Sequence, residues 1–163
     1  MNNIIFLFVT LFGIGKLKSI PGSYASLATT LFLFLLFHIL NISVNFVLIF
    51  IIIIFLISLY AVNIFIKDID NKDPKEVVID EFIGQSIPIC LYEVAHEGTK
   101  ETSQILTIYF VMFILFRIFD IVKPYPVSYY DKNFKNSFGV VMDDVCAGLY
   151  VVAVLVLYMV ITS

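Results

Sequence analysis

Four long apolar stretches, separated by short polar segments, run along this chain. They cover residues 24–42, 44–66, 105–122 and 139–161, and the stretch 44–66 has no charged residue. Each is close to the roughly 20 residues that a helix needs to cross a bilayer. Because lipid offers no partner to backbone N–H and C=O groups, a spanning segment must bond them internally as a helix. The pattern therefore predicts an all-α, integral membrane helical bundle.

Two shorter apolar stretches fit a straight crossing less well. Residues 4–12 have no basic residue before them and no small-residue cleavage site after them. We therefore interpret them as an interfacial or re-entrant segment rather than a signal peptide. Residues 82–92 contain Pro88, which kinks or breaks a helix, and this fits a half-crossing. The sequence predicts a single domain over residues 1–163 with four to five spans and a short apolar N-terminal segment.

The positions of the basic residues favour the fifth crossing. If residues 82–92 cross, nine of the ten Lys and Arg residues fall on one side and only Lys100 on the other. The nine are Lys16, Lys18, Lys67, Lys72, Lys75, Arg117, Lys123, Lys132 and Lys135. Because basic loops stay in the cytoplasm, we expect five crossings with the lysine-rich side cytoplasmic.

The composition excludes several classes of protein. Apolar residues make up 61% of the chain and charged residues 14%, against about 25% charged in an average soluble domain. This excludes a disordered chain, a nucleic-acid-binding protein and an ordinary soluble globule. Cys90 and Cys146 lie in apolar runs without a CxxC spacing, so they indicate neither a disulfide framework nor a zinc site.

Three clusters of ionisable residues lie at the ends of the apolar stretches, all on the same predicted face. They comprise Asp80 with Glu81, Arg117 with Asp120 and Lys123, and Asp143 with Asp144. A charged side chain at the centre of a membrane helix costs roughly 2.5–3.5 kcal/mol, so charges within such segments are candidates for function. The alternatives are that single acidic residues merely anchor span ends at the interface, and that Arg117 and Asp120 form a structural ion pair.

The acidic residues indicate a metal site. Carboxylates brought together repel one another unless a cation compensates them. Carboxylate oxygens without a convergent histidine suit Mg²⁺, Mn²⁺ or Ca²⁺ rather than zinc. Arg117 and Lys123 beside such a site suit a phosphate-bearing ligand. We also interpret the turn at Pro21–Ser23, which follows Lys16, as a polar rim for phosphate.

At these clusters the chain resembles the phosphatidylglycerophosphatase A family. The matching stretches stand in the family's order and include most of the polar part of the chain. They are IPGSYASLA (20–28), VVIDEFIGQ (77–85), FRIFDIVKPYPVSYYDKN (116–133) and GVVMDDVCAG (139–148). The resemblance implies a Mg²⁺-dependent phosphatase of the bacterial inner membrane that converts phosphatidylglycerophosphate into phosphatidylglycerol, with its active site facing the cytoplasm.

The resemblance also implies roles for particular residues. The family's acidic motif positions, for catalysis and for Mg²⁺, fall on Asp80, Glu81, Asp120, Asp143 and Asp144. We expect the phosphate to be bound by Lys16, Ser23, Arg117 and Lys123. Water would attack the phosphorus, a spare carboxylate would take its proton, and the phospholipid substrate would stay in the bilayer.

Two other functions remain as alternatives. A CDP-alcohol phosphotransferase also gathers aspartates around a metal, but it places several at helical spacing within one span. A non-enzymatic cation carrier would hold its carboxylates near the middle of the membrane. This chain divides its acidic residues among three segments at one face. Release of phosphate without a second alcohol distinguishes the phosphatase from both.

Overall fold

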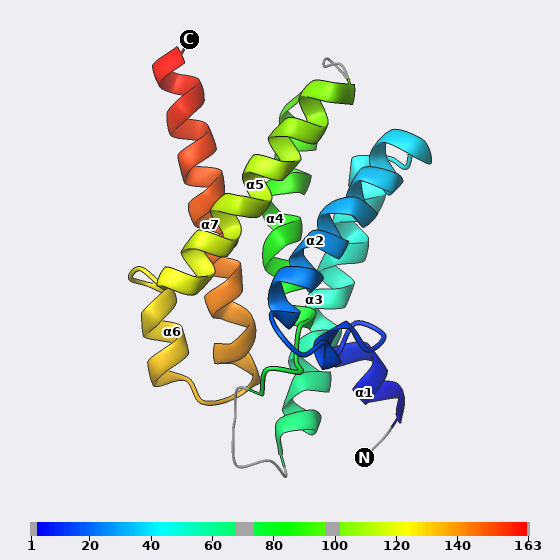
Figure 1. Ribbon diagram of the computed structural model, residues 1–163, viewed down its shortest axis with the longest axis vertical. Coiled ribbons are helices and arrows are strands. Elements are labelled where there is room, and N and C mark those ends of the chain that lie inside the picture. Colours follow the sequence, from blue (N-terminus) through cyan, green and yellow to red (C-terminus); the bar gives the residue numbers. More distant parts are fainter. Residues whose placement is uncertain (1–2, 68–73, 97–101, 163) are drawn as a thin grey trace.

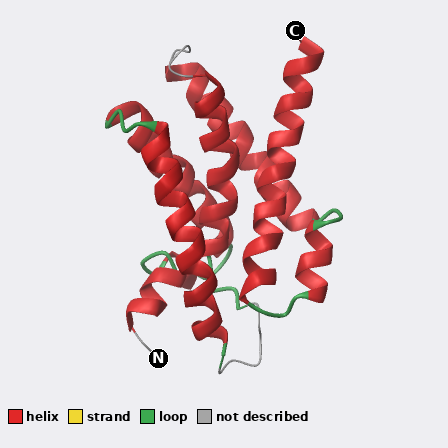
Figure 2. Cartoon of the chain, turned by 180° about the vertical axis from the view of Figure 1, so that it is seen from behind, coloured by secondary structure: helices red, strands yellow, loops and turns green. Residues whose placement is uncertain are grey.

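The described residues of this chain form helices and loops, with no β-strand among them (Figure 2). The computed structural model describes residues 3–67, 74–96 and 102–162. The helices are α1 (Asn3–Val9), the short 3₁₀ helix η1 (Ile14–Lys16), α2 (Pro21–Phe34) with a π-helical end η2 (Leu35–Ile39), α3 (Val44–Ile66), α4 (Ile79–His96), α5 (Thr102–Val122), α6 (Val127–Asn133) and α7 (Ser137–Thr162). The predicted all-α class is confirmed.

Within the described residues, four helical segments are long and apolar enough to cross a membrane. They are Pro21–Ile39, Val44–Ile66, Ser103–Val122 and Ser137–Ile161. The four predicted spans are thus confirmed; the third and fourth begin two residues earlier than predicted, and the first is shifted by three. The first span begins at Pro21 rather than 24, since proline is favoured in the first turn of a helix. It ends at Ile39 rather than 42, and Asn41 then turns the chain with a φ of 51°.

The outer surface of α3 is suited to lipid. Ile49, Ile52, Leu56 and Tyr60 are all exposed, and their spacing places them along one side of the helix. In water such a continuous apolar surface would be costly. In a bilayer it is the expected outer face, because lipid tails are as apolar as these side chains.

Helix α4 occupies the centre of the bundle, between α2 and α3 on one side and α5 and α7 on the other (Figure 1). It is one helix of 18 residues that includes Pro88, and at 1.5 Å per residue it is about 27 Å long. Residues 82–92 are thus part of a longer helix than the apolar stretch predicted, and the fifth crossing stays a prediction. The helix extends over Asp80 and Glu93 at its two ends, because neighbouring helices cover these polar side chains.

A close contact between α4 and α7 holds the centre of the bundle together. A Cβ atom on Gly84 would lie 2.5 Å from the backbone oxygen of Asp144, so any larger residue would force the helices apart. A Cβ atom on Gly148 would in turn lie 2.3 Å from the backbone oxygen of Gly84. The missing side chains allow the backbones to approach, and this brings Asp144 to the beginning of α4.

The beginnings of α2, α4 and α7 and the end of α5 lie toward the same end of the bundle as α1 and α6 (Figure 1). We call this the α1 end. Lys67 follows α3 and Lys123 follows α5, so they lie at this end as the charge distribution predicted. Lys72 and Lys100, which also entered that prediction, fall outside the described residues.

A buried polar cluster joins three helices at the opposite end of the bundle. The Tyr109 hydroxyl of α5 donates a hydrogen bond of 2.9 Å to Glu93 Oε1 of α4. His38 Nε2, in the π-helical end of α2, lies 3.3 Å from the same oxygen. Tyr109 is 1% exposed and Glu93 7%, so these contacts connect α2, α4 and α5 within the bundle.

Candidate metal and phosphate site

Asp80 and Glu81 lie in the first turn of α4. Carboxylates are favoured there because the exposed N–H groups give the helix N-terminus a partial positive charge. The segment before them is held by a hydrogen bond of 2.9 Å from the Val78 N–H to the Val9 oxygen at the end of α1. Asp80 is buried and Glu81 is nearly so, so the beginning of α4 carries two carboxylates inside the bundle.

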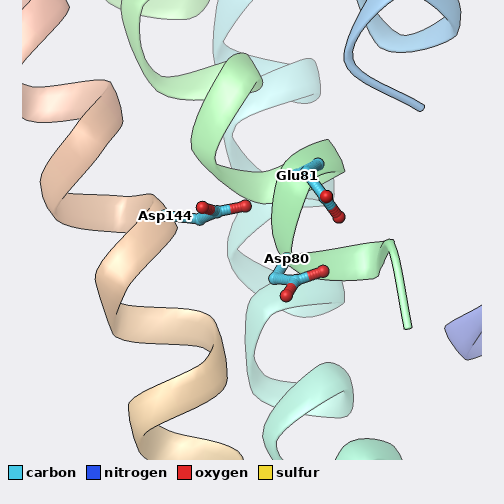
Figure 3. A group of neighbouring side chains, drawn as sticks. All are labelled: Asp80, Glu81 and Asp144. Carbon is cyan, nitrogen blue, oxygen red and sulfur yellow. The ribbon is translucent and has the colours of Figure 1, made fainter. Parts of the chain in front are cut away.

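Asp144 of α7 completes a cluster with these two residues. One carboxylate oxygen from each of Asp80, Glu81 and Asp144 lies within 4.8 Å of the others, and Figure 3 shows the Asp144 side chain directed toward α4. Asp144 is only 3% exposed. We call these three residues the carboxylate cluster.

The carboxylate cluster has the chemistry of a site for a hard divalent cation. Glu81 Oε2 and Asp144 Oδ2 are buried and have no hydrogen-bond partner in the described part of the chain. Buried acceptors are normally satisfied, and three carboxylates this close repel one another unless a cation lies between them. Oxygen ligands alone favour Mg²⁺ or Ca²⁺, so the residues present fit Mg²⁺.

Arg117 links the carboxylate cluster to Asp120. Its Nη1 lies 2.7 Å from Asp120 Oδ2 and 3.7 Å from Glu81 Oε1, and it donates to Ser26 Oγ of α2 at 3.5 Å. Arg117 and Asp120 are three residues apart, so they share one side of α5. The structure thus places Asp120 beside the carboxylate cluster, paired with Arg117, and outside the group of three.

Lys123, like Arg117, is a basic residue paired with carboxylates beside the cluster. Its Nζ lies 2.7 Å from Asp131 Oδ1 and 2.7 Å from Asp143 Oδ2. Burial alone would lower the pKa of Lys123, but the charges of Asp143 and Asp131 outweigh burial, and the pKa is raised above its ordinary value. Lys123 therefore stays protonated at neutral pH. Asp143 forms an ion pair with Lys123 and is not a member of the carboxylate cluster.

One cavity of about 440 Å³, which we call the acidic cavity, joins these groups. It lies where the beginnings of α2, α4 and α7 meet the end of α5. The predicted residues that line it are Ser23, Asp80, Glu81, Arg117, Asp120, Lys123, Asp143 and Asp144. Carboxylates and cations here surround a space large enough for a phosphate-bearing group.

Lys16 is the predicted site residue that does not line the acidic cavity. It lines an adjacent pocket, and its Nζ lies 4.4 Å from the centre of the Phe6 ring, in a cation–π contact. Lys16 is close to the turn at Pro21 in the sequence. The sequence did not predict the conformation of residues 17–20, which directs Lys16 into the adjacent pocket.

Gln85 is a polar residue near the site that sequence reasoning missed. It is fully buried, and neither of its amide atoms has a hydrogen-bond partner among the described residues. It follows Glu81 by four residues, so it lies on the same side of α4 one turn further along. Its amide within the apolar run FIGQSIP could have identified it from the sequence as a candidate site residue, since glutamine is seldom buried.

Comparison with known proteins finds a family whose model covers most of this chain. Residues 7–159 match the model of the family described as Phosphatidylglycerophosphatase A. A Haemophilus influenzae protein named Phosphatidylglycerophosphatase A is 33% identical over 143 residues, which are 88% of this chain and 81% of that protein.

Two further relatives match over shorter regions. A Bacteroides thetaiotaomicron protein named "Putative phosphatidylinositol-3-phosphatase" is 42% identical over 79 residues, 48% of this chain and 45% of that protein. The Escherichia coli protein named Phosphatidylglycerophosphatase A is 31% identical over 83 residues, 51% of this chain and 43% of that protein. No solved structure matches the chain.

Proposed function

Since this chain belongs to the phosphatidylglycerophosphatase A family and is a phosphatidylglycerophosphate phosphatase, we propose that Mg²⁺ supports its reaction. The products would be phosphatidylglycerol and inorganic phosphate. The observation that carries the proposal is the carboxylate cluster, three buried acidic side chains with oxygens within 4.8 Å of one another. Such a cluster is costly without a cation, and a cation beside it would stabilise the charge on a transferred phosphoryl group.

Asp80, Glu81 and Asp144 would hold Mg²⁺. The chemistry that the ion supplies when bound is neutralisation of charge on the phosphoryl oxygens and activation of water. Asp120 and Asp143 are engaged with Arg117 and Lys123, so we assign them to positioning these cations rather than to binding the ion.

Arg117 and Lys123 would bind the phosphomonoester from two sides of the acidic cavity. A water oxygen forms a bond to phosphorus while the bond from phosphorus to the glycerol oxygen breaks. A carboxylate of the cavity takes one proton from the water and passes it to the leaving oxygen, which becomes the glycerol hydroxyl, while the other proton stays on the released phosphate. The side chains of Arg117 and Lys123 stabilise the negative charge on the phosphoryl oxygens.

The lipid tails would remain in the bilayer during this reaction. The acidic cavity is bordered by the exposed side chains of Ile20 and Ile121, which provide an apolar edge beside the charged interior. We propose that this end of the bundle faces the cytoplasm of a bacterial inner membrane, as the basic residues that follow α3 and α5 favour.

Phosphate release tests this proposal directly. Detergent-purified protein is given phosphatidylglycerophosphate in non-ionic micelles, with Mg²⁺ or with EDTA. We expect release with Mg²⁺, little with EDTA, and little from Asp144→Asn. The matched control is Glu93→Gln, which removes a similarly buried carboxylate at the opposite end and should retain activity. Release that is equal in EDTA would contradict the metal assignment.

The phosphotransferase and carrier alternatives have less support. The carboxylate cluster comes from α4 and α7 rather than from one span, and it lies toward one end of the bundle. The same assay separates the alternatives, because a phosphotransferase passes its phosphoryl-bearing group to an alcohol and a carrier cleaves no bond, so neither releases inorganic phosphate. Phosphatidylinositol 3-phosphate belongs in the assay as a second substrate, given the name of one relative.

A further inference from the structure

A second polar pocket lies directly beside the acidic cavity. It also has a volume of about 440 Å³, and Ser19, Pro21 and Lys75 line both spaces. Lys16, Lys18 and Lys75 all line it, against one acidic residue, Glu76. We call it the lysine pocket, and it has the opposite charge character to the carboxylate cluster.

We propose that the lysine pocket binds the phosphodiester group of the lipid substrate while the acidic cavity holds the phosphomonoester. This inference rests on the proposed function. It adds a second phosphate subsite and assigns substrate selectivity to Lys18, which lines the lysine pocket without lining the acidic cavity.

The chemistry of the substrate requires a place for a second anion. Phosphatidylglycerophosphate carries a terminal phosphomonoester and, one glycerol unit away, the phosphodiester that joins it to diacylglycerol. The carboxylates of the acidic cavity would repel the diester. A neighbouring pocket with three lysines accepts it, since ammonium groups bind phosphate oxygens as point charges.

The lysine pocket is formed by a tight backbone contact. A Cβ atom on Gly15 would lie 2.0 Å from the backbone oxygen of Glu76, so only glycine permits this approach. Lys16 follows Gly15 and Lys75 precedes Glu76, so the contact brings the two lysines together from distant parts of the sequence. The Gly15 N–H also donates to the Thr10 oxygen at 3.0 Å.

The beginning of α2 adds to the positive character of the shared wall. Pro21 is its first residue; no acidic side chain lies in the first turn, and no side chain caps it. The N–H groups of a first helical turn favour anions, and Glu81 Oε1 already lies against this turn, where a Cβ on Gly22 would be 2.0 Å from it. The wall between the two spaces is therefore suited to the glycerol link between two phosphates.

The pocket predicts which lipids the enzyme selects. Phosphatidic acid has a phosphomonoester but no phosphodiester, so it would occupy the acidic cavity alone. Phosphatidylglycerol, the product, keeps the diester and has lost the monoester. Inorganic phosphate would bind in the acidic cavity only. These molecules report on the two subsites separately.

The test compares Lys18→Ala with wild type in non-ionic micelles. Lys18 is exposed and lines the lysine pocket without lining the acidic cavity, so we expect the variant to fold and to leave the acidic cavity intact. We expect KM for phosphatidylglycerophosphate to rise about tenfold, with kcat changed less than twofold. The inhibition constant of phosphatidylglycerol should rise by a similar factor, and that of inorganic phosphate should stay the same. Lys132→Ala, an exposed lysine of α6 outside both spaces, is the matched control.

Three results would overturn the inference. KM of Lys18→Ala could stay within twofold of wild type. Lys132→Ala could raise KM as much as Lys18→Ala does, which would show that lysines at this end act only through the general charge of the surface. The inhibition constant of phosphate could rise together with that of phosphatidylglycerol, which would place Lys18 at the monoester. Failure of the proposed function differs from all of these, because wild type would then release no phosphate.

Discussion

The adjacent residues Asp143 and Asp144 have different surroundings, although the sequence analysis predicted the same role for both. Asp144 belongs to the carboxylate cluster, whereas Asp143 contacts Lys123 Nζ at 2.7 Å. We expect Asp144→Asn to lower kcat by a factor of at least about 100, the scale of losing a group that stabilises transition-state charge. We expect Asp143→Asn to lower it about tenfold, the scale of losing a supporting contact.

The measurement is kcat at saturating Mg²⁺, followed by a Mg²⁺ titration of both variants. The apparent Mg²⁺ affinity should fall for Asp144→Asn and change little for Asp143→Asn. Equal loss of affinity in the two variants would place Asp143 among the metal ligands.

Arg117 contacts two carboxylates with one planar group, at 2.7 Å from Asp120 and 3.7 Å from Glu81. A lysine keeps the charge but loses the flat fork that reaches several oxygens at once. We expect Arg117→Lys to lower kcat/KM about tenfold or more, measured by phosphate release from the lipid substrate. Wild-type kcat/KM in this variant would show that only the positive charge matters at this position.

At the level of elements, the position of α4 depends on polar contacts at both of its ends. At the end away from the site, the Tyr109 hydroxyl donates to Glu93 at 2.9 Å, and removing one partner of a buried hydrogen bond costs about 1–3 kcal/mol. We expect Tyr109→Phe to lower the thermal unfolding temperature in detergent by several degrees, while activity at low temperature is retained.

Tyr60→Phe is the control for this substitution. Tyr60 is an exposed residue of α3, 69% accessible, so removing its hydroxyl should leave the unfolding temperature unchanged. If Tyr109→Phe and Tyr60→Phe unfold at the same temperature as wild type, the cluster at this end contributes no stability to the bundle.

At the level of the whole molecule, the course of α4 decides which loops share a side of the membrane. If α4 crosses, Ser103, at the beginning of α5, lies on the side opposite Lys67, which follows α3. Cysteines introduced at these exposed positions should react with a membrane-impermeant maleimide from opposite sides. Lys67→Cys should be labelled only in inside-out vesicles and Ser103→Cys only in intact spheroplasts.

The native Cys90 and Cys146 give little background in this experiment, since they are 2% and 9% exposed. Labelling of both introduced cysteines from the same side would show that α4 does not cross. Labelling from opposite sides with the orientation reversed would place the acidic cavity outside the cytoplasm.

Much of this molecule follows from the sequence because lipid imposes strict local rules. The four confirmed spans could be predicted from length and composition, since an apolar segment in a bilayer must be helical. The acidic residues could be found because charges within such segments are rare. The length of α4 could not be predicted, because its polar residues are tolerated only where other helices cover them.

The tertiary structure alone decided which acidic residues converge. Asp80, Glu81 and Asp144 form the carboxylate cluster, while Asp120 and Asp143 pair with Arg117 and Lys123. This division depends on how each helix is rotated about its axis and on how closely α4 and α7 approach at Gly84. Such contacts join residues about 60 positions apart, so no local pattern encodes them, and only the packing of the whole bundle determines them.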